Sequence, residues 1–187
     1  GVLDRLGLGY ETLREINPRI VLASISGYGQ SGPWSRYAGY GPVGAALSGL
    51  SSVTGYVGGG PEELGLSMPD PTAGITAAFA VVAALEKREH TGLGDHLDVT
   101  LWESTAVLGI EAWLEQVLTG SPPPRIGNRD ASMAPHGCYR CLGDDAWVSI
   151  ACRGDGEWQV LAAMLGVADD ARFATLADRK ANEDCLL

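Results

Sequence analysis

Basic residues are scarce in this sequence of 187 residues, where 13 Lys and Arg stand against 23 Asp and Glu. The formal net charge is −10 at pH 7, and the Lys and Arg residues form no cluster along the chain. A protein of this charge is not expected to bind a nucleic-acid backbone or an anionic membrane surface. An anionic small molecule is still compatible with it, because a local pocket can be positive on an acidic protein.

Long hydrophobic runs are absent as well. The longest, from Ala73 to Leu85, is interrupted by Gly74 and Thr76 and is too short to span a bilayer. The N-terminus does not show the charged and then apolar stretch of a secretory leader. We therefore expect a soluble protein of the cytoplasm that contacts no membrane.

Cysteine is rare, and all four cysteines lie in the last third of the sequence. Disulfides are not expected in a chain without a secretory signal. Cys138 and Cys141 form a C-x-x-C pair, but no second pair stands at metal-binding spacing. We expect core cysteines on strands and no metal site, with zinc or redox chemistry as the minor alternative.

Hydrophobic patterning predicts an α/β protein. Residues 20–26 are strand formers with little polarity, typical of a parallel strand covered on both faces. The loop over residues 27–33 follows at that strand's carboxyl end, where open α/β sheets bind ligands. The first predicted helix has its core positions at Leu3, Leu6, Leu13 and Ile16. The predicted helices cover residues 1–16, 71–89, 101–118 and 157–165, and the predicted strands cover residues 20–26, 96–100, 137–141 and 146–151.

The clearest predicted helix follows Asp70, with Asp70 at its N-cap and Pro71 at its first helical position. The almost uniformly apolar stretch up to Glu89 predicts a helix buried in the domain interior. The dipole and free N–H groups at such a helix start favour an ionised carboxylate and can stabilise oxyanions. On these residues alone, a structural N-cap worth about 1 kcal/mol is the favoured interpretation of Asp70.

Eight short motifs occur along nearly the whole chain. They are residues 17–21 (NPRIV), 24–33 (SISGYGQSGP), 47–50 (LSGL), 70–74 (DPTAG), 84–88 (ALEKR), 91–94 (TGLG), 125–128 (RIGN) and 134–135 (AP). In order and spacing they resemble the family III CoA-transferases, a family that includes formyl-CoA transferase, carnitine CoA-transferase and α-methylacyl-CoA racemase. Each motif alone is weak, but eight in the same order are a specific signal, and they favour a catalytic role for Asp70 over a plain cap.

The resemblance implies a partial, Rossmann-like large domain, a proline linker and the start of a small α+β domain. We expect residues 1–119 to be the central part of the large domain, residues 120–136 the linker and residues 137–187 the start of the small domain. The linker prediction depends on the run Gly-Ser-Pro-Pro-Pro-Arg at residues 120–125. Members of the family are roughly twice this length and form interlocked homodimers, so we expect a partial chain that lacks much of the CoA pocket.

The resemblance assigns Asp70 a covalent role. In the family an aspartate at this motif position attacks an acyl-CoA thioester, forms a mixed anhydride and then becomes an aspartyl-CoA thioester. A carboxylic acid acceptor then takes over the CoA. Splitting one hard step into easier ones is the general logic of covalent catalysis. The expected partners are therefore an acyl-CoA and a carboxylic acid, with the CoA thioester as substrate and no permanently bound cofactor.

Other residues of the resemblance indicate transfer rather than racemisation. Tyr40 stands where the racemases carry a histidine, and Arg153 stands where they carry a second carboxylate. Racemisation needs an acid/base group on each face of the α-carbon, and a phenol is a poor substitute for histidine. Tyr40 is thus a candidate substrate- or CoA-binding residue, although packing in the domain interior is an equal alternative.

The glycine loop after the first strand gives three further candidates for substrate or CoA binding: Gly27, Gly29 and Gln30. Glycines at a strand end can order main-chain N–H groups near a thioester, or they can merely turn the chain. Some transferases of the family carry a run of glycines between the positions of Asn128 and Pro135, whereas this chain has Arg-Asp-Ala-Ser-Met-Ala. That departure weakens assignment to the formyl-CoA or oxalate branch.

Three functions remain open at this point. The first is CoA transfer between carboxylic acids through Asp70. The second is an acyl-CoA racemase or epimerase on the same scaffold, and the third is a non-catalytic truncated remnant that keeps the fold.

Overall fold

The computed structural model describes residues 1–186, and it divides the chain into two compact units. The first unit ends at Arg125 and the second begins at Ile126. This boundary falls inside residues 120–136, which the sequence predicts as a linker. The assignment of the units to a large and a small domain stays a prediction.

Helices and strands alternate as predicted for an α/β protein. The first unit contains α1 (Val2–Arg5), α2 (Tyr10–Ile16), β1 (Val21–Ser26), α3 (Gly41–Leu47), α4 (Leu50–Val53), α5 (Pro69–Thr91), β2 (Asp95–Thr100), α6 (Leu101–Ala106) and α7 (Ile110–Thr119). The second unit contains β3 (His136–Arg140), β4 (Trp147–Ala151), α8 (Asp155–Leu165) and α9 (Leu176–Ala181).

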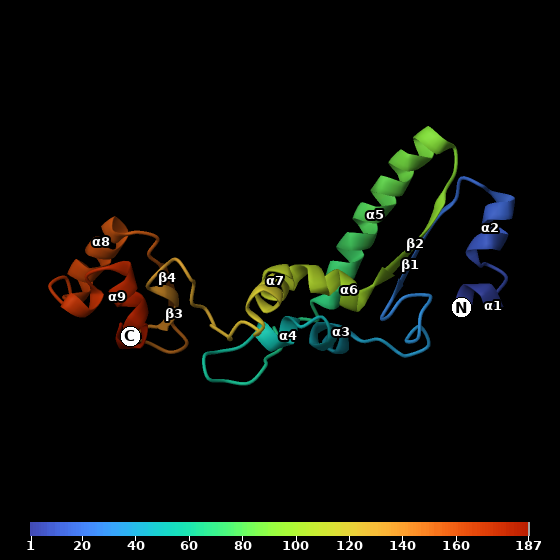
Figure 1. The fold of residues 1–187 in the computed structure, drawn as a ribbon. Coiled ribbons are helices and arrows are strands. Elements are labelled where there is room, and N and C mark those ends of the chain that lie inside the picture. The colour runs from blue at the N-terminus through green and yellow to red at the C-terminus, as the bar shows by residue number, and fades with distance from the viewer. Residues whose placement is uncertain (187) are drawn as a thin grey trace. The chain divides into compact units, whose positions relative to one another are not determined.

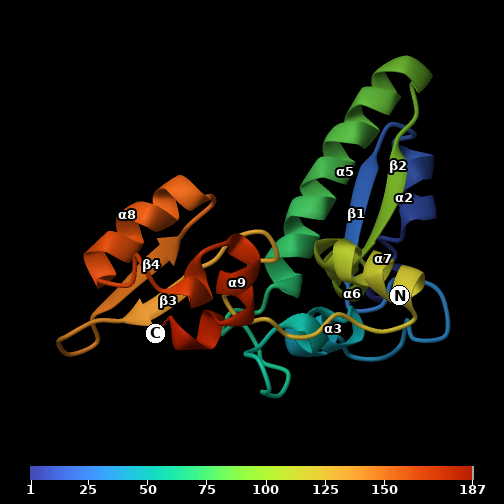
Figure 2. The same ribbon diagram turned by 60° about the vertical axis from the view of Figure 1, so that its left-hand side comes forward.

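In the first unit, β1 and β2 pair in parallel, from Val21 opposite Asp95 to Ser26 opposite Thr100. The long helix α5 connects back to β2 and packs along both strands, while α2 lies on the other side of the pair (Figures 1 and 2). The ring of Tyr10 on α2 stacks on His96 of β2 with centroids 5.1 Å apart. The predicted parallel arrangement is confirmed, and the carboxyl ends of both strands point the same way. The prediction that the first strand is covered on both faces is wrong, because Ile25 is 50% exposed.

Small residues allow the helices to approach one another closely at that end. Ala73 and Ala77 of α5 form a buried cluster with Val99 and Leu101. Gly44 of α3 lies against the same region, because an added methyl group would be 3.2 Å from Pro69 and 3.5 Å from Leu101. This packing holds the start of α5 beside α3.

The prediction that α5 is buried all round is wrong for one face. Ile75, Phe79 and Val82 are 73%, 76% and 65% exposed. Within residues 1–186 the strands and α3 and α6 contact the opposite, alanine-rich side of the helix. The apolar sequence of α5 is therefore buried only on the face that the strands, α3 and α6 cover.

Two predicted helices are each interrupted in the structure. The helix over residues 1–16 breaks between Arg5 and Tyr10, because Gly7 has a left-handed φ of 70° that ends α1. Of the core positions predicted in it, Leu13 is half-buried, and the structure leaves Leu3, Leu6 and Ile16 exposed. The helix over residues 101–118 changes into a 3₁₀ turn at Val107–Gly109 before α7 begins.

In the second unit the two predicted strands appear as β3 and β4, which pair as an antiparallel hairpin with His136 opposite Ala151 and Arg140 opposite Trp147. The core of the second unit contains Trp158, Ala162 and Phe173. Leu165 at the end of α8 is 53% exposed and is not part of this cluster.

A fully buried arginine, Arg179 of α9, ties the second unit together. Its guanidinium donates to the carbonyl oxygens of Ala134 (2.9 Å) and Phe173 (3.4 Å) and to Asp155 Oδ1 (2.7 Å). It also lies 5.3 Å from the centre of the Trp158 ring. One side chain thereby links α9 to α8 and to the segment before β3.

Among residues 1–186, no helix is long and apolar enough to cross a membrane.

Candidate active site

The site is built around the first turn of α5. The helix begins at Pro69, so Asp70 is the second helical residue and Pro71 the third, and Met68 takes the cap position. The prediction of Asp70 as the N-cap is therefore wrong by two positions. Pro71 is tolerated there because the first four N–H groups of a helix have no intrahelical acceptor. Asp70 is exposed and stays within the turn where the helix dipole favours negative charge.

The Asp70 carboxylate has a hydroxyl partner three residues upstream. Ser67 Oγ donates a hydrogen bond to Asp70 Oδ2, and the Asp70 backbone N–H donates to the Ser67 carbonyl oxygen at 3.3 Å. Ser67 is half-buried. The two residues therefore form a small loop that presents the carboxylate just inside the helix start.

Gly41, the buried first residue of α3, packs directly against this loop. A methyl group added to Gly41 would overlap the Ser67 hydroxyl and the Asp70 carboxylate, both on the side of Oδ2. Only glycine leaves room for such an approach. The backbone of α3 thus forms one wall beside Asp70.

Tyr40 precedes Gly41 at the N-cap of α3, so the structure brings Tyr40 and Asp70 into one neighbourhood. Its side chain is 69% exposed. The alternative that Tyr40 packs in the domain interior is therefore wrong within the described chain. Its role in binding a substrate or CoA stays a prediction.

Gly27 joins the same neighbourhood from the end of β1. Its backbone touches that of Gly39, and a methyl group on either glycine would overlap the Cα atom of the other. The contact places the end of β1 against the residue before Tyr40. Gly27, Tyr40 and Asp70 are therefore connected through backbone contacts at Gly39 and Gly41.

Gly29 and Gln30 turn the loop after β1. Gly29 is buried with a φ of 92°, which favours glycine, and its N–H donates to Ser26 Oγ at 3.0 Å. The N–H of Gln30 donates to Asp98 Oδ2 at 2.8 Å. Both N–H groups are thus already used within the chain.

A cavity of about 400 Å³ runs along β1 beside Gly29 and Gln30. Its lining includes Tyr10, Ser24 and His96, and Ser24 Oγ lies 2.9 Å from His96 Nε2. Tyr40 and Asp70 are not among its lining residues. The predicted binding residues therefore divide into two groups, one around Asp70 and one along β1.

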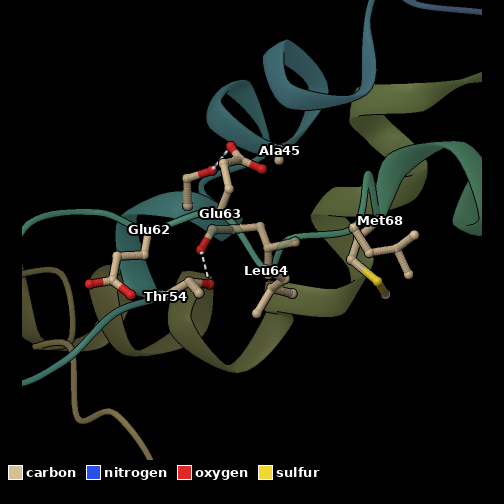
Figure 3. Close-up of a pocket in the computed structure, with 9 residues that line it drawn as sticks. Ala45, Thr54, Glu62, Glu63, Leu64 and Met68 are labelled. Carbon is tan, nitrogen blue, oxygen red and sulfur yellow. Dashed lines mark hydrogen bonds between the residues drawn. The ribbon is translucent and has the colours of Figure 1, made fainter.

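A second, much smaller pocket lies close to the start of α5. Figure 3 shows residues that line it, including Ala45, Thr54, Glu62, Glu63, Leu64 and Met68. Its volume of about 10 Å³ has room for no more than a single water molecule. Ser51 Oγ donates to Glu63 Oε1 at 3.1 Å across it. It is too small for any organic substrate.

Arg153 and the run at residues 129–134 belong to the second unit. The backbone N–H of Arg153 donates to Glu157 Oε2 at 2.6 Å. Arg129 pairs with Asp184, and Lys180 Nζ donates to the Asp130 carbonyl oxygen at 2.6 Å. In this chain the run that replaces the glycines is therefore tied to the segment around α9.

All four cysteines are free thiols, and within residues 1–186 no three His, Cys, Asp or Glu side chains gather as a metal site would require. Cys138 and Cys185 are exposed, so the expectation of core cysteines fails at both. Cys152 is buried, and burial raises the pKa of its thiol, with a smaller contribution from the charge of Glu157. Cys152 is therefore held as the unreactive neutral thiol at neutral pH.

Sequence reasoning missed three residues of the site: Ser67, Gly39 and Gly41. A signal for Ser67 was available, because a serine three residues before an aspartate at a helix start is a common local hydrogen-bonding pair. No such signal existed for Gly39 and Gly41. Their role depends on contacts with segments 12 and more residues away, which a single sequence does not reveal.

The family model for CoA-transferase family III matches residues 1–187. Acetyl-CoA:oxalate CoA-transferase of Acetobacter aceti is 38% identical over 100% of this chain and 48% of its own length. Succinate–glutarate CoA-transferase of Agrobacterium fabrum is 33% identical over 97% of this chain and 46% of its own length. The chain thus spans about half the length of the curated relatives it matches.

Among solved structures, a CAIB/BAIF family protein from Brucella suis superposes with a TM-score of 0.90 at 33% sequence identity. The match covers 100% of this chain and 50% of that chain. A second structure, Rv3272 from Mycobacterium tuberculosis, gives a TM-score of 0.76 at 26% identity.

Proposed function

Because the chain belongs to CoA-transferase family III, we propose that it carries the nucleophile of an enzyme that moves CoA between carboxylic acids. The nucleophile is Asp70. The observation that carries this proposal is the exposed Asp70 carboxylate in the first turn of α5, held by Ser67 and walled by Gly41. A structural cap would take the cap position itself, whereas Asp70 lies inside the helix.

The proposed reaction starts with an attack by an Asp70 oxygen on the carbonyl carbon of an acyl-CoA. A C–O bond forms, the C–S bond breaks and CoA leaves as a thiolate. The thiolate then attacks Cγ of Asp70 in the mixed anhydride and expels the donor acid as a carboxylate. This leaves an aspartyl-CoA thioester.

The acceptor acid completes the cycle. Its carboxylate attacks Cγ of the thioester, expels CoA thiolate and forms a second anhydride. The thiolate attacks the acceptor's acyl carbon, which yields the new acyl-CoA and restores the Asp70 carboxylate. Every leaving group is a carboxylate or a thiolate, so no external oxidant or reductant is needed.

We propose small dicarboxylates as the first acids to test, because the names of two relatives specify oxalate, succinate and glutarate. The run at residues 129–134, which lacks glycine, gives no reason to favour oxalate among them. We also propose that the protein acts in the cytoplasm as a homodimer and holds no permanent cofactor. The resemblance of the ordered motifs to the family supports these points.

Racemisation and a non-catalytic remnant are the competing functions. Tyr40 and Arg153 stand where the racemases carry acid/base groups, and neither side chain suits proton abstraction at neutral pH. The remnant hypothesis predicts no chemistry at Asp70 at all. One experiment separates the three.

The experiment uses the full-length natural polypeptide in which this chain occurs. Incubation with acetyl-CoA or succinyl-CoA without an acceptor should leave a covalent adduct on Asp70, detected by mass spectrometry after hydroxylamine or borohydride treatment. Asp70→Ala should abolish both the adduct and CoA transfer. Normal transfer by Asp70→Ala would refute the role of Asp70, and deuterium exchange at the substrate α-carbon without transfer would favour the racemase.

A further inference from the structure

The two oxygens of Asp70 have different surroundings. Oδ2 accepts the hydrogen bond from Ser67 Oγ, and it is also the carboxylate oxygen that faces the Gly41 backbone. Within residues 1–186, no hydrogen bond from a side chain reaches Oδ1. The oxygen with the free lone pairs is therefore Oδ1, which makes it the better nucleophile.

We propose that the Ser67 hydroxyl is an oxyanion donor for the half of the reaction in which Asp70 is attacked. This inference rests on the proposed function of Asp70 as the acyl and CoA carrier. It concerns a residue that neither the ordered motifs nor the comparisons assign.

The assignment follows from tracking the oxygens through the reaction. When Oδ1 attacks the acyl-CoA, Oδ1 becomes the bridging oxygen of the anhydride and Oδ2 becomes the carbonyl oxygen of Asp70. CoA thiolate then adds to Cγ, and negative charge develops on Oδ2. Collapse of this intermediate breaks the bond between Cγ and Oδ1, and the donor acid departs as a carboxylate.

The same oxygen carries the charge when the acceptor arrives. The acceptor carboxylate adds to Cγ of the aspartyl-CoA thioester, charge develops again on Oδ2, and CoA thiolate leaves. A donor that already contacts Oδ2 in the resting enzyme needs no rearrangement to stabilise these intermediates. Ser67 donates through a neutral O–H group. The negative charge of the Asp70 carboxylate is therefore not neutralised, and Asp70 can still attack the acyl-CoA.

Ser67 should therefore affect the steps of the cycle unequally. In the first step Asp70 is the nucleophile, and a hydrogen bond to Oδ2 gives that attack no help. In the two middle steps, the attacks by CoA thiolate and by the acceptor carboxylate, Cγ is the electrophile, and loss of one oxyanion donor typically costs about 10²-fold in rate. A merely structural serine would slow every step that depends on the position of Asp70.

The test compares wild type, Asp70→Ala and Ser67→Ala in the full-length natural polypeptide, with acetyl-CoA and succinyl-CoA as donors. Transfer to succinate or glutarate should fall about 10²-fold in Ser67→Ala with an unchanged KM for the acyl-CoA. The burst of CoA that leaves when the anhydride forms, measured without an acceptor and with a thiol-trapping reagent present, should remain. Because the anhydride then waits for water, the ratio of acyl-CoA hydrolysis to transfer should rise by a similar factor.

Two further variants serve as controls. Ser51→Ala removes a similar bond from a serine to a carboxylate, that of Ser51 to Glu63, and should leave both rates unchanged. Ser67→Cys keeps the shape of the side chain with a weaker donor and should transfer at an intermediate rate, which also decides the matter if Ser67→Ala does not fold.

The outcomes separate the two hypotheses. An equal loss of the CoA burst and of transfer in Ser67→Ala, or no loss of either, would overturn the role of Ser67 while leaving that of Asp70 intact. Failure of wild type to form any adduct on Asp70 would overturn both.

Discussion

At the scale of single residues, the surroundings of Asp70 depend on a hydroxyl on one side and on the lack of a side chain on the other. Ser67 contacts Oδ2 through its hydroxyl, and Gly41 leaves the space in which that oxygen lies. Both contacts constrain Oδ2 of Asp70, and they come from different segments of the chain. Changes at either residue should therefore alter the reactivity of Asp70 more than they alter the fold.

Substitution of Gly41 by alanine tests this view. The added methyl group would overlap both Ser67 Oγ and Asp70 Oδ2, so the two side chains must leave their present positions. We expect CoA transfer by the full-length protein to fall at least about 10-fold, because a misplacement of about 1 Å can cost 10²-fold. The stability loss should be about 1–3 kcal/mol, as in other overpacked sites, measured by urea denaturation.

Gly156→Ala is the matched control for that substitution. Gly156 is also in the first turn of a helix, α8, but an added methyl group would meet nothing within 4 Å. Transfer at the wild-type rate is expected for this variant. Full activity of Gly41→Ala itself would show that the close approach to Asp70 has no catalytic consequence.

At the scale of elements, α9 is attached to the second unit chiefly through one buried cation, Arg179. Methionine fills a similar volume but cannot donate to the carbonyl oxygens of Ala134 and Phe173. Each buried acceptor left without a partner costs about 1–3 kcal/mol, whereas Asp155 is mostly exposed and can return to water. Arg179→Met should therefore lower the free energy of unfolding by about 3 kcal/mol.

Arg172→Met provides the comparison for this prediction. Arg172 pairs with Asp170 at 2.7 Å and lowers the pKa of that carboxyl, but its side chain is 58% exposed. Its loss should change stability by no more than about 0.5 kcal/mol. Urea denaturation followed by tryptophan fluorescence measures both variants, and equal effects would contradict the view that Arg179 is the main attachment.

Elements with strong local signals could be predicted from the sequence, namely β1 as a strand of a parallel sheet, α5, and the strands β3 and β4. The start of α5 was misplaced because Pro69 and Pro71 both suit the first helical position, and the preference for Asp at the N-cap favoured a start at Pro71. The break at Gly7 was missed because the hydrophobic period continues across it. Ser67 and Gly41 depend on contacts between segments, which local patterns do not report.

At the scale of the whole molecule, the first unit carries many exposed apolar side chains on its helices. The exposed apolar side chains gather on α5, with Phe79 as an example, and on α7, with Val117 and Leu118. Such surfaces usually mark interaction sites or aggregation-prone regions.

The 187-residue chain, produced by itself, should therefore bind a hydrophobic dye such as ANS and associate as its concentration rises. We expect fluorescence several-fold above that of the full-length natural protein at equal mass, and light scattering above the monomer value. Phe79→Glu should reduce both signals, because it places a charge on the exposed face of α5. A monomer without dye binding would show that the apolar faces are covered within the chain itself.

The touching backbones of Gly27 and Gly39 have an evolutionary consequence. Because neither position has room for a side chain, the segment that leads from β1 to Tyr40 can diverge at its outward-facing residues but not at these two. If Asp70 is the nucleophile as proposed, its surroundings are therefore kept while the outward-facing residues of this segment change. In a comparison of many descendants, the two glycines should be retained together even where the residues between them are freely replaced.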